Sequence, residues 1–498
     1  MSLTKTVGLF AGTTLLAGAA FGAGDSTNYQ QEIADLRAEI ASMKAQSGDN
    51  WLTEQRAAEI KGLVQDVLAD ADTRASLQGT GATAGFDNGF FLSSADGNFR
   101  LNVGGTASAR FTYNNRSNSY DQNSGTYDNN WGFAIRHTGL SFDGYMFDPS
   151  WKYGVSLAIY DETAIVPSSL DYNNGQVFLL DAYVMKDFGD FYVQAGQFKS
   201  AITRQGSLNL WDLQMVDMAN VDYIFGTQWT QGIKLGFDND MMRAHVTYSE
   251  GVGGNSPVLN SQFTDYNGGA NGSIGNTSPA NQLAFDGRAE FKMGGTWAQF
   301  DDEQSWQGEE FGLLIGVGAY WQKGRVNGDV NGVPGAPGTA TNFGGQSWGL
   351  TADATADFGG FNLFGAFYYA GTNNYNAPAG DPGNQTDSWG FQVQGGAFVS
   401  EDMEIAARYE YGDLRNGDAA PSESILSAGL NMYFSKNRVK WQSDIGYSFD
   451  SLTATGGANN QGGGWAVSGT GWLPDNGTNA ANGGGGEWLI RSQFTVTF

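Results

Sequence analysis

The segment Asn98–Tyr113 reads NFRLNVGGTASARFTY, and apolar and polar side chains alternate along it. The apolar positions hold Phe99, Leu101, Val103, Ala107, Ala109, Phe111 and Tyr113, and the polar positions hold Arg100, Asn102, Thr106, Ser108, Arg110 and Thr112. Because successive side chains of a β-strand point to opposite faces, this pattern predicts one strand with an apolar face and a polar, cationic face. At roughly 16 residues it is longer than an average globular strand and is typical of tilted strands that cross a bilayer.

The same alternation returns at the end of the chain, where Glu487–Phe498 reads EWLIRSQFTVTF. Strand patterns also recur between these two segments. We predict strands near 98–113, 133–146, 151–160, 177–187, 190–199, 229–237, 241–250, 282–293, 310–322, 346–358, 361–370, 388–399, 402–411, 425–434, 438–449 and 487–498. An even number of long strands is typical of outer-membrane barrels, so we expect an all-β fold, a transmembrane antiparallel β-barrel of about 16 strands.

The connections between the predicted strands alternate in length. Connections such as Phe188–Gly189 and Gly359–Gly360 are tight, whereas Val252–Asn281 and Ser451–Gly486 are long and rich in Gly and Asn. Short turns at one end and long loops at the other are typical of an outer-membrane barrel with its loops outside. One connection departs from the rule, because Gly294–Gly308 is expected to be a long turn at the short-turn end.

A water-soluble β-sandwich would also show alternating strands, and it is the competing fold. Aromatic residues decide between the two, because barrels in membranes carry aromatic girdles where their strands leave the lipid. Such residues stand at the ends of many predicted strands: Trp131, Trp151, Trp348, Trp389, Trp441 and Trp488. The sequence therefore favours the barrel.

Composition narrows the class of protein further. The 498 residues include no cysteine, which removes disulfides and thiolate sites, and the formal net charge is −26, which argues against nucleic-acid binding. No apolar run reaches the roughly 18 residues that a membrane helix needs, so an α-helical membrane protein is excluded. The acidic excess is explained either by a solvated surface or by a surface that gathers divalent cations.

The N-terminal region differs from the rest of the chain. Residues 1–23 have the cationic start, apolar stretch and small residues of a secretory signal peptide. Residues 24–78 are expected to form a helical, coiled-coil arm, residues 79–89 a Gly-rich linker, and residues 90–498 the barrel. A short seam in the arm indicates association between copies of the chain, although packing on the same chain is the alternative. The seam consists of Ile33, Leu36, Ile40 and Met43.

In a barrel the polar face lines the lumen, so the strand pattern also predicts which cations line a pore. These candidates are Arg100, Arg110, Lys152, Lys234, Arg243, Arg288, Lys292, Arg408, Arg438, Lys440 and Arg491. The alternative is that such charges only solvate a polar wall. Barrels of this size leave an aqueous channel unless something fills it, and Ser200–Thr227 is too apolar for an exposed loop. We expect this segment to fold inward, and the alternative is a loop packed at a subunit contact.

Catalysis has little support in the sequence. The two histidines, His137 and His245, have no serine nucleophile pattern beside them, and the Asp- and Asn-rich turns match no ordered calcium loop. We therefore predict no catalytic residues, no metal site, no cofactor and no enzyme activity.

Several segments resemble the phosphate-selective porin O and P family. They are the opening GFFLSSADGNFRLNVGG at Gly89–Gly105, LDAYVMKDFGDFYVQAGQFK at Leu180–Lys199, AARYEYGD at Ala406–Asp413 and LNMYFSKNRVK at Leu430–Lys440, and the helical region Trp51–Leu77 resembles the arms that precede such barrels. The resemblance covers most of the chain after the signal peptide. It implies a trimeric outer-membrane barrel that passes anions, with inward-folded loops forming its constriction.

The sequence departs from this family directly after the GQFK motif. There the family's usual proline and paired acids are replaced by Ala201, Ile202, Thr203, Arg204 and Gln205. We name Gln197, Lys199 and Arg204 as candidates for the constriction.

The leading hypothesis is an outer-membrane porin, a water-filled channel for passive diffusion of small hydrophilic solutes and ions, with an anion preference of the phosphate type. Its expected partners are outer-membrane lipid and further copies of the chain in a homotrimer, and no nucleic acid. The alternative is a structural barrel whose helical arm ties the outer membrane to the cell wall.

Overall fold

The computed structural model describes residues 34–39, 41–42, 61, 82–87, 89–116, 129–160, 176–249, 251–252, 283–323, 345–374, 385–413, 422–450, 452, 470–472 and 486–498. The chain divides into two compact units, Met1–Gly81 and Ala82–Phe498. In the first unit, residues 34–39, 41–42 and 61 have helical backbone. The predicted signal peptide and most of the predicted seam lie outside the described residues.

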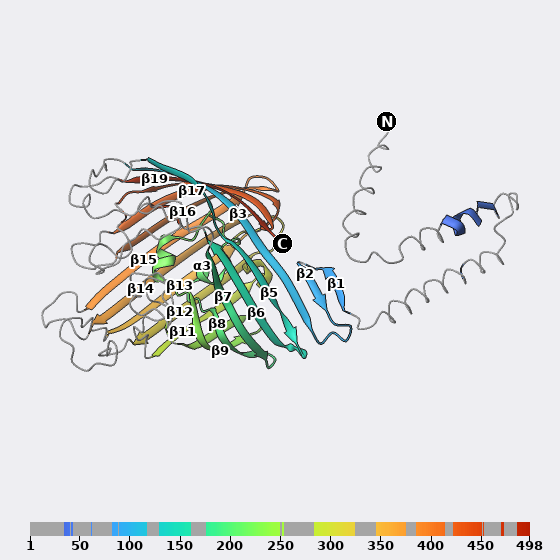
Figure 1. Ribbon diagram of the computed structural model, residues 1–498. Coiled ribbons are helices and arrows are strands. Elements are labelled where there is room, and N and C mark those ends of the chain that lie inside the picture. Colours follow the sequence, from blue (N-terminus) through green and yellow to red (C-terminus); the bar gives the residue numbers. More distant parts are fainter. Residues whose placement is uncertain are drawn as a thin grey trace, which may run out of the picture. The chain divides into compact units, whose positions relative to one another are not determined.

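The second unit is built from one antiparallel sheet of nineteen strands (Figure 1). They are β1 (Thr83–Phe86), β2 (Phe90–Ser93), β3 (Arg100–Arg116), β4 (Asn129–Ile135), β5 (Thr138–Met146), β6 (Asp148–Tyr160), β7 (Gln176–Asp187), β8 (Phe191–Lys199), β9 (Trp229–Asp238), β10 (Met242–Ser249), β11 (Leu283–Gly294), β12 (Gly312–Lys323), β13 (Gly345–Asp357), β14 (Phe361–Asn374), β15 (Gln385–Phe398), β16 (Met403–Asp413), β17 (Glu423–Ser435), β18 (Val439–Ser448) and β19 (Glu487–Thr497). Strands that follow one another in the chain pair with each other, except β4 and β5, which both pair with β3.

The sheet closes on itself, because β19 pairs with β3 from Glu487↔Arg116 to Thr497↔Thr106. Strands β4 and β5 pair with successive parts of β3 and act as one barrel strand, interrupted at Arg136 and His137. The interruption has a local cause, since His137 has a φ of 51°, which an extended strand does not accommodate. The result is a closed antiparallel barrel of 16 strands, which confirms the predicted fold.

The hairpin of β1 and β2 lies outside the closed ring. Strand β2 pairs with Arg100–Val103 of β3, and β19 pairs with Thr106–Arg116 on the same edge of β3. The hairpin therefore continues the barrel wall beyond the C-terminal end of β19. Figure 1 shows both short strands beyond the end of the ring where the C-terminus lies. Strand β1 falls inside the range expected as a linker, which shows that the Gly-rich sequence there does not prevent pairing.

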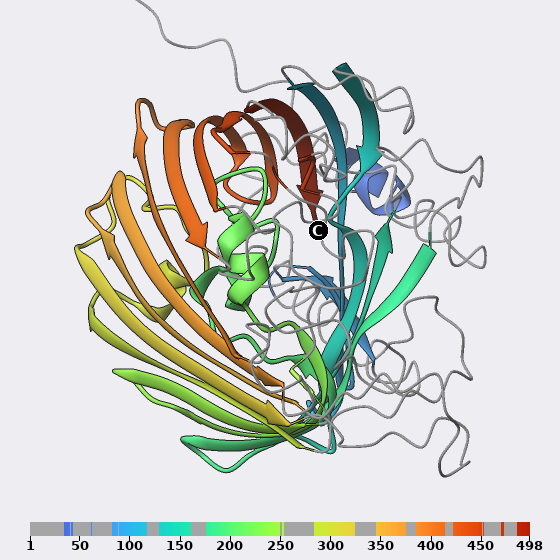
Figure 2. The same ribbon diagram turned by 90° about the vertical axis from the view of Figure 1, so that its left-hand side faces the viewer.

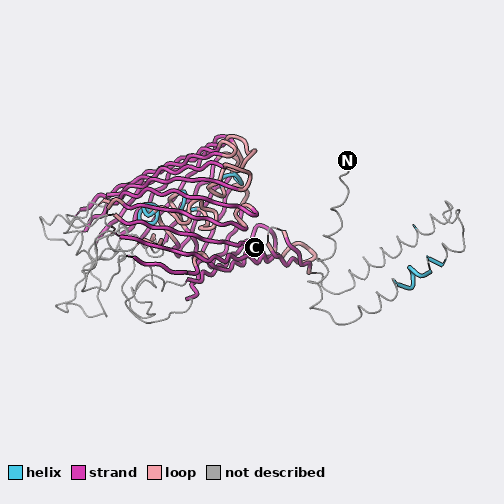
Figure 3. The backbone as a smooth tube through the Cα atoms, turned by 90° about the horizontal axis from the view of Figure 1, so that it is seen from above, coloured by secondary structure: helices cyan, strands magenta, loops and turns pink. Residues whose placement is uncertain are grey.

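The turns follow the predicted alternation at the end of the barrel where they are described. Phe147 alone joins β5 to β6, and Phe358–Gly360 joins β13 to β14. The predicted exception is real, because residues 295–311 join β11 to β12 and contain the 3-10 helix η4 (Trp297–Phe300). Figure 3 shows the tilted strands from above.

The two faces of the barrel have opposite character. Large apolar side chains on the outer face are exposed, up to 73% at Phe133 and 67% at Trp131, whereas inner side chains such as Gln392 and Lys440 are fully buried. A water-soluble sandwich would bury its apolar face, so this inside-out distribution excludes that alternative. Among the described residues, no helix is long and apolar enough to cross a membrane.

Candidate channel constriction

Residues 200–228, which we call the inward segment, fold into the barrel between β8 and β9. They contain α3 (Arg204–Ser207) and α4 (Asn220–Phe225), which the ring of strands encloses in Figure 2. Leu213, Val216 and Val221 of this segment are 0% exposed. The apolar content that predicted inward folding is therefore buried against the barrel wall.

The inward segment is tied together around Asp222. The Thr203 hydroxyl accepts a hydrogen bond from Gly206 N (3.1 Å), which caps α3, and donates one to Asp222 Oδ1 (2.7 Å) in α4. The Tyr368 hydroxyl of β14 donates to Asp222 Oδ2 (2.8 Å). Burial raises the pKa of Asp222 to about 6. One carboxyl group thus joins both helices of the segment to the wall.

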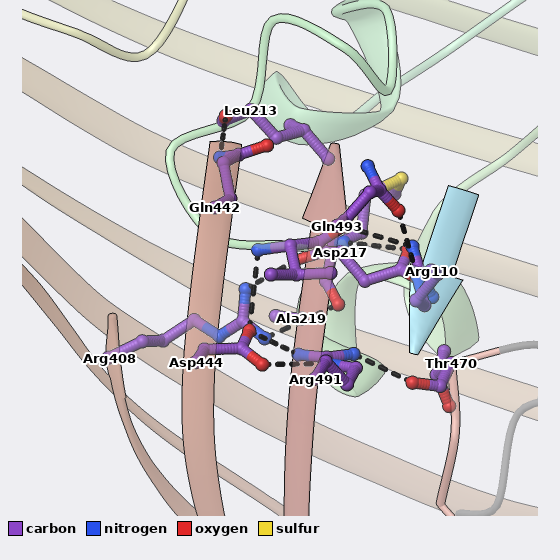
Figure 4. Close-up of polar contacts among 12 residues, drawn as sticks. Arg110, Leu213, Asp217, Ala219, Arg408, Gln442, Asp444, Thr470, Arg491 and Gln493 are labelled. Carbon is purple, nitrogen blue, oxygen red and sulfur yellow. Dashed lines mark hydrogen bonds and ion pairs between the residues drawn. The ribbon is translucent and has the colours of Figure 1, made fainter. Parts of the chain in front are cut away.

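Two arginines of the barrel wall bind the inward segment between α3 and α4, at residues 216–217 (Figure 4). Arg110 Nη1 lies 2.8 Å from Asp217 Oδ2, and its Nη2 donates to the Val216 carbonyl at 3.1 Å. Arg408 Nη1 donates to the Asp217 carbonyl at 2.8 Å. Burial opposes ionisation of Asp217, but the Arg110 guanidinium holds the pKa of that carboxyl well below its usual range. The inward segment therefore meets the wall through a buried ion pair.

The long turn of residues 295–311, which we call the supporting turn, reaches the same segment from the other end of the barrel. Glu303 N donates to the Asp212 carbonyl at 3.1 Å. The Glu303 carboxylate accepts from Gln205 Nε2 (2.7 Å), Gln214 N (2.8 Å) and Gln394 Nε2 (3.0 Å). Buried polar groups need such partners, so Glu303 links the supporting turn, the inward segment and strand β15.

Six of the eleven predicted pore-lining cations are buried. Four of them donate to backbone carbonyls of the inward segment: Arg110 to Val216, Arg288 to Ile202, Arg408 to Asp217 and Lys440 to Leu213. Lys234 donates to the Lys199 carbonyl of β8 at 2.8 Å. Arg491 pairs with Asp444, with 2.7 Å between Nη2 and Oδ2. Four of the six buried cations therefore hold the inward segment against the wall, whereas Lys234 and Arg491 contact other wall strands.

The other five predicted cations are at least partly exposed. Three of them form ion pairs: Arg100 with Asp87 at 3.3 Å, Lys152 with Asp187 at 2.6 Å, and Arg243 with both Asp238 and Asp301 at 3.3 Å. Lys292 Nζ donates to the Gly295 carbonyl at 2.9 Å. The Arg438 guanidinium lies 5.9 Å from the centre of the Phe86 ring.

The three constriction candidates have different surroundings. Gln197 Nε2 donates to the Leu179 and Leu180 carbonyls of β7, at 2.7 and 2.9 Å, and so belongs to the wall. Lys199 Nζ donates to the Leu208 carbonyl at 2.8 Å. Arg204 donates to the carbonyls of Phe300 and Asp302. Lys199 and Arg204 therefore contact the inward segment or the supporting turn, whereas Gln197 does not.

Asp217, Asp222 and Glu303 are central to the site, and sequence reasoning missed all three. The alternation of inward and outward positions along a strand identifies wall residues, whereas these three acids lie in the connections between strands. A usable signal was present in the supporting turn, because Trp297, Phe300 and Trp306 make it too aromatic for an exposed turn. That criterion had already identified the inward segment.

The lumen wall has two regions of different water access. At the inward positions of β5, β6 and β7, which we call the open wall, the described side chains are exposed or half-buried, except Ala158, which is 3% exposed. They are Ser141, Asp143, Tyr145, Lys152, Ser156, Asp181, Tyr183 and Met185. At the inward positions of β12–β18, which we call the covered wall, side chains such as Thr351, Arg408 and Ser427 are at most 6% exposed. Among the described wall residues, water therefore reaches inward side chains of β5–β7 but not those of β12–β18 such as Arg408.

A cavity of about 370 Å³ lies between the inward segment and the supporting turn. Its lining includes Arg204, Asp212, Arg243, Glu290 and Trp297. Among the described residues, no group of three or more His, Asp and Glu side chains could hold a metal ion. The two histidines have different neighbours. His137 Nε2 lies 3.7 Å from Asp217, and His245 Nε2 lies 3.9 Å from Asp286.

No protein-family model matches the sequence, and no curated protein matches it either. Solved structures do match. The anion-selective porin from Comamonas acidovorans is 14% identical with a TM-score of 0.49, covering 80% of this chain and 99% of that chain. The outer membrane channel DcaP of Acinetobacter baumannii is 14% identical with a TM-score of 0.46, covering 83% and 100%. OmpT, an outer membrane protein of Vibrio cholerae in its trimer form, is 10% identical with a TM-score of 0.43, covering 79% and 98%. Likenesses this distant leave function to be argued from the residues of this chain.

Proposed function

We propose that this protein is an outer-membrane channel for passive diffusion of small hydrophilic solutes and ions. The observation that carries the proposal is the division of the lumen wall. The inward segment, together with Trp472 near Ser427, buries the polar side chains of the covered wall, whereas Asp143 and Lys152 of the open wall stay exposed. A closed barrel of 16 strands with one side of its lumen in water has the features of a narrowed diffusion pore.

The outer face supports a membrane location. Exposed aromatic and aliphatic side chains cover it, and a surface of this kind is stable when lipid, not water, surrounds it. Export through the predicted signal peptide and insertion in the outer membrane are part of the proposal. Assembly as a homotrimer and attachment to the cell wall through the helical arm stay predictions from the sequence.

The anion preference, which the family resemblance implies, needs separate treatment, because most of the eleven predicted pore-lining cations are already engaged. Six of these are buried, and three of the exposed ones, Arg100, Lys152 and Arg243, are already paired with carboxylates. A cation engaged in this way attracts a passing anion weakly. The resemblance to phosphate-selective porins is what supports phosphate transport, and the contacts of these cations do not add to it.

Single-cysteine variants test the channel and its route together, because the natural chain has no cysteine. We would record Ser141→Cys of the open wall and Ser427→Cys of the covered wall in planar bilayers. A charged thiol reagent added from the bath should change the conductance of Ser141→Cys and leave that of Ser427→Cys unchanged, because Ser427 is 3% exposed. The natural chain treated with the same reagent is the control.

Two results would contradict the proposal. Absence of discrete conductance steps from correctly folded natural protein would exclude a channel. Equal reaction of both cysteines would leave the channel intact but would show that the inward segment does not confine the route to the open wall.

A further inference from the structure

Two neighbouring rows of the sheet concentrate polar groups on the open wall. Asn102, Asp143, Gly154 and Tyr183 face one another in register across β3, β5, β6 and β7. In the next row, Ser156 pairs with Asp181. Two carboxylates therefore lie on adjacent rows of the same wall, on either side of β6.

Neither of these carboxylates forms an ion pair, although Lys199 and Lys234 interact electrostatically with Asp181 from a longer distance. Asp143 Oδ2 accepts from Asn102 Nδ2 at 2.9 Å, and Asp181 Oδ1 accepts from Trp229 Nε1 at 3.0 Å. The Ser156 hydroxyl also donates to Asp181. Neutral donors orient a carboxylate without cancelling its charge, and none of the ion pairs between described residues includes Asp143 or Asp181.

The exposed cations near this wall do not balance the two carboxylates. Lys152 of β6 is paired with Asp187 at 2.6 Å, and Arg100 of β3 is paired with Asp87 at 3.3 Å. The buried arginines beneath the inward segment face Asp217, Asp353 and Asp444. Water on the open wall is therefore in contact with negative charge that no ion pair cancels, although Lys199 and Lys234 offset that of Asp181 in part.

Tyr183 adds a second feature that suits cations. A side chain at Gly154 would begin 2.7 Å from the Tyr183 ring, so the ring lies over this glycine, in the same row as Asp143. The half-buried ring is part of the open wall. The face of an aromatic ring attracts cations, most strongly where water is partly excluded.

We infer that Asp143 and Asp181 make the channel cation-selective, so that small cations and ammonium-bearing solutes cross it more readily than anions. The inference rests on the proposed channel function and names its solute class. It needs no ion bound at a fixed position, because a narrow water-filled space with walls of low dielectric concentrates ions of opposite charge. The formal net charge of −26 acts in the same direction from a longer range.

The test is the ratio of potassium to chloride permeability, taken from the reversal potential across a potassium chloride gradient in planar bilayers. The natural protein should give a ratio above one, and the double variant Asp143→Asn, Asp181→Asn should lower it by about two- to fivefold at low salt. Asp143→Glu, which keeps the charge, should retain the natural ratio. The double variant Asp190→Asn, Asp240→Asn is the matched control, because it removes an equal charge from two exposed turns between strands.

The outcomes separate this inference from the proposed function. Discrete conductance with a ratio of one or less in the natural protein, or with an unchanged ratio in the double variant, overturns the inference and leaves the channel standing. Complete absence of conductance in the natural protein overturns the channel itself. Only variants that give discrete conductance steps are compared, so a variant that does not fold cannot imitate a loss of selectivity.

Discussion

The open and covered walls have the same strand pattern but different surroundings. Both alternate apolar residues outward and polar residues inward, as Asp143 in β5 and Asp353 in β13 illustrate. Asp143 is exposed and accepts from a neutral amide, whereas Asp353 is 6% exposed and pairs with Arg288 at 2.7 Å. Alternation therefore determines which face a side chain occupies, and the inward segment determines whether that side chain meets water.

This difference changes the meaning of a lumen-facing charge. On the covered wall, a guanidinium such as that of Arg408 fastens the inward segment through its backbone carbonyls. On the open wall, a carboxylate such as that of Asp181 acts on the ions that pass. A lumen-facing charge can thus contribute mainly to stability on the covered wall and mainly to selectivity on the open wall.

The largest effect is expected from Arg110→Ala, which should expose the covered wall to water and so remove the difference between the two walls. The change leaves the Asp217 carboxylate buried without its guanidinium partner, a loss that typically costs about 3–5 kcal/mol. We expect the inward segment to detach near Val216, so that conductance rises and becomes noisy. The measurement is thiol modification of Ser427→Cys, which should turn from unreactive to reactive in the Arg110→Ala background.

Arg110→Lys serves as the control for charge in this experiment. It keeps a cation beside Asp217 but removes the planar donors that also reach Val216, so its effect should fall between the natural protein and Arg110→Ala. Unchanged conductance and an unreactive Ser427→Cys in the Arg110→Ala background would show that Arg110 does not hold the covering in place.

Much of the fold could be predicted from the sequence, because successive residues of a barrel strand alternate between lipid and lumen and their polarity alternates accordingly. Strand β3 begins and ends within a few residues of the predicted range 98–113, and β19 begins at the predicted Glu487. The break at Arg136 and His137 was not predictable from alternation. It depends on a positive φ at His137, which is a property of the folded backbone.

The candidate site was less predictable, because its contacts join segments far apart in the chain. The alternation along the strand correctly placed Arg110 on the inner face, but it could not show that Asp217 Oδ2 lies 2.8 Å from the Arg110 guanidinium. Alternation also does not distinguish Asp143 from Asp353, because both occupy inward positions. Water access depends on where the inward segment packs, and tertiary contacts such as those of Glu303 decide that packing. A pattern within a single strand contains no information about such contacts.

A smaller effect is expected from Glu303→Gln, which weakens the covering from the side of the supporting turn. The amide offers one acceptor oxygen in place of two, and its NH₂ group would face donors from Gln205 or Gln214. Leaving a buried donor unsatisfied costs about 1–3 kcal/mol. We expect faster modification of Ser427→Cys than in the natural background, but slower than with Arg110→Ala.

Glu310→Gln is the matched control for this change. It makes the same substitution at an exposed position of the supporting turn, and it should leave the reactivity of Ser427→Cys as it is in the natural background. Equal rates for the Glu303 and Glu310 variants would indicate that the supporting turn does not stabilise the inward segment.

The smallest effect is expected from Arg100→Ala, which changes the same strand and face as Arg110→Ala. Arg100 and its partner Asp87 are exposed, with 27% and 68% of their side chains in solvent, and such pairs contribute about 0–1 kcal/mol. Stability and the reactivity of Ser427→Cys should therefore stay unchanged. Removing this cation leaves Asp87 uncompensated at the short-turn end, so the potassium-to-chloride permeability ratio should rise slightly, opposite to the change with Asp143→Asn. If Arg100→Ala uncovered Ser427 as strongly as Arg110→Ala does, position on the polar face alone would decide the role of each arginine, and the distinction between the two walls would fail.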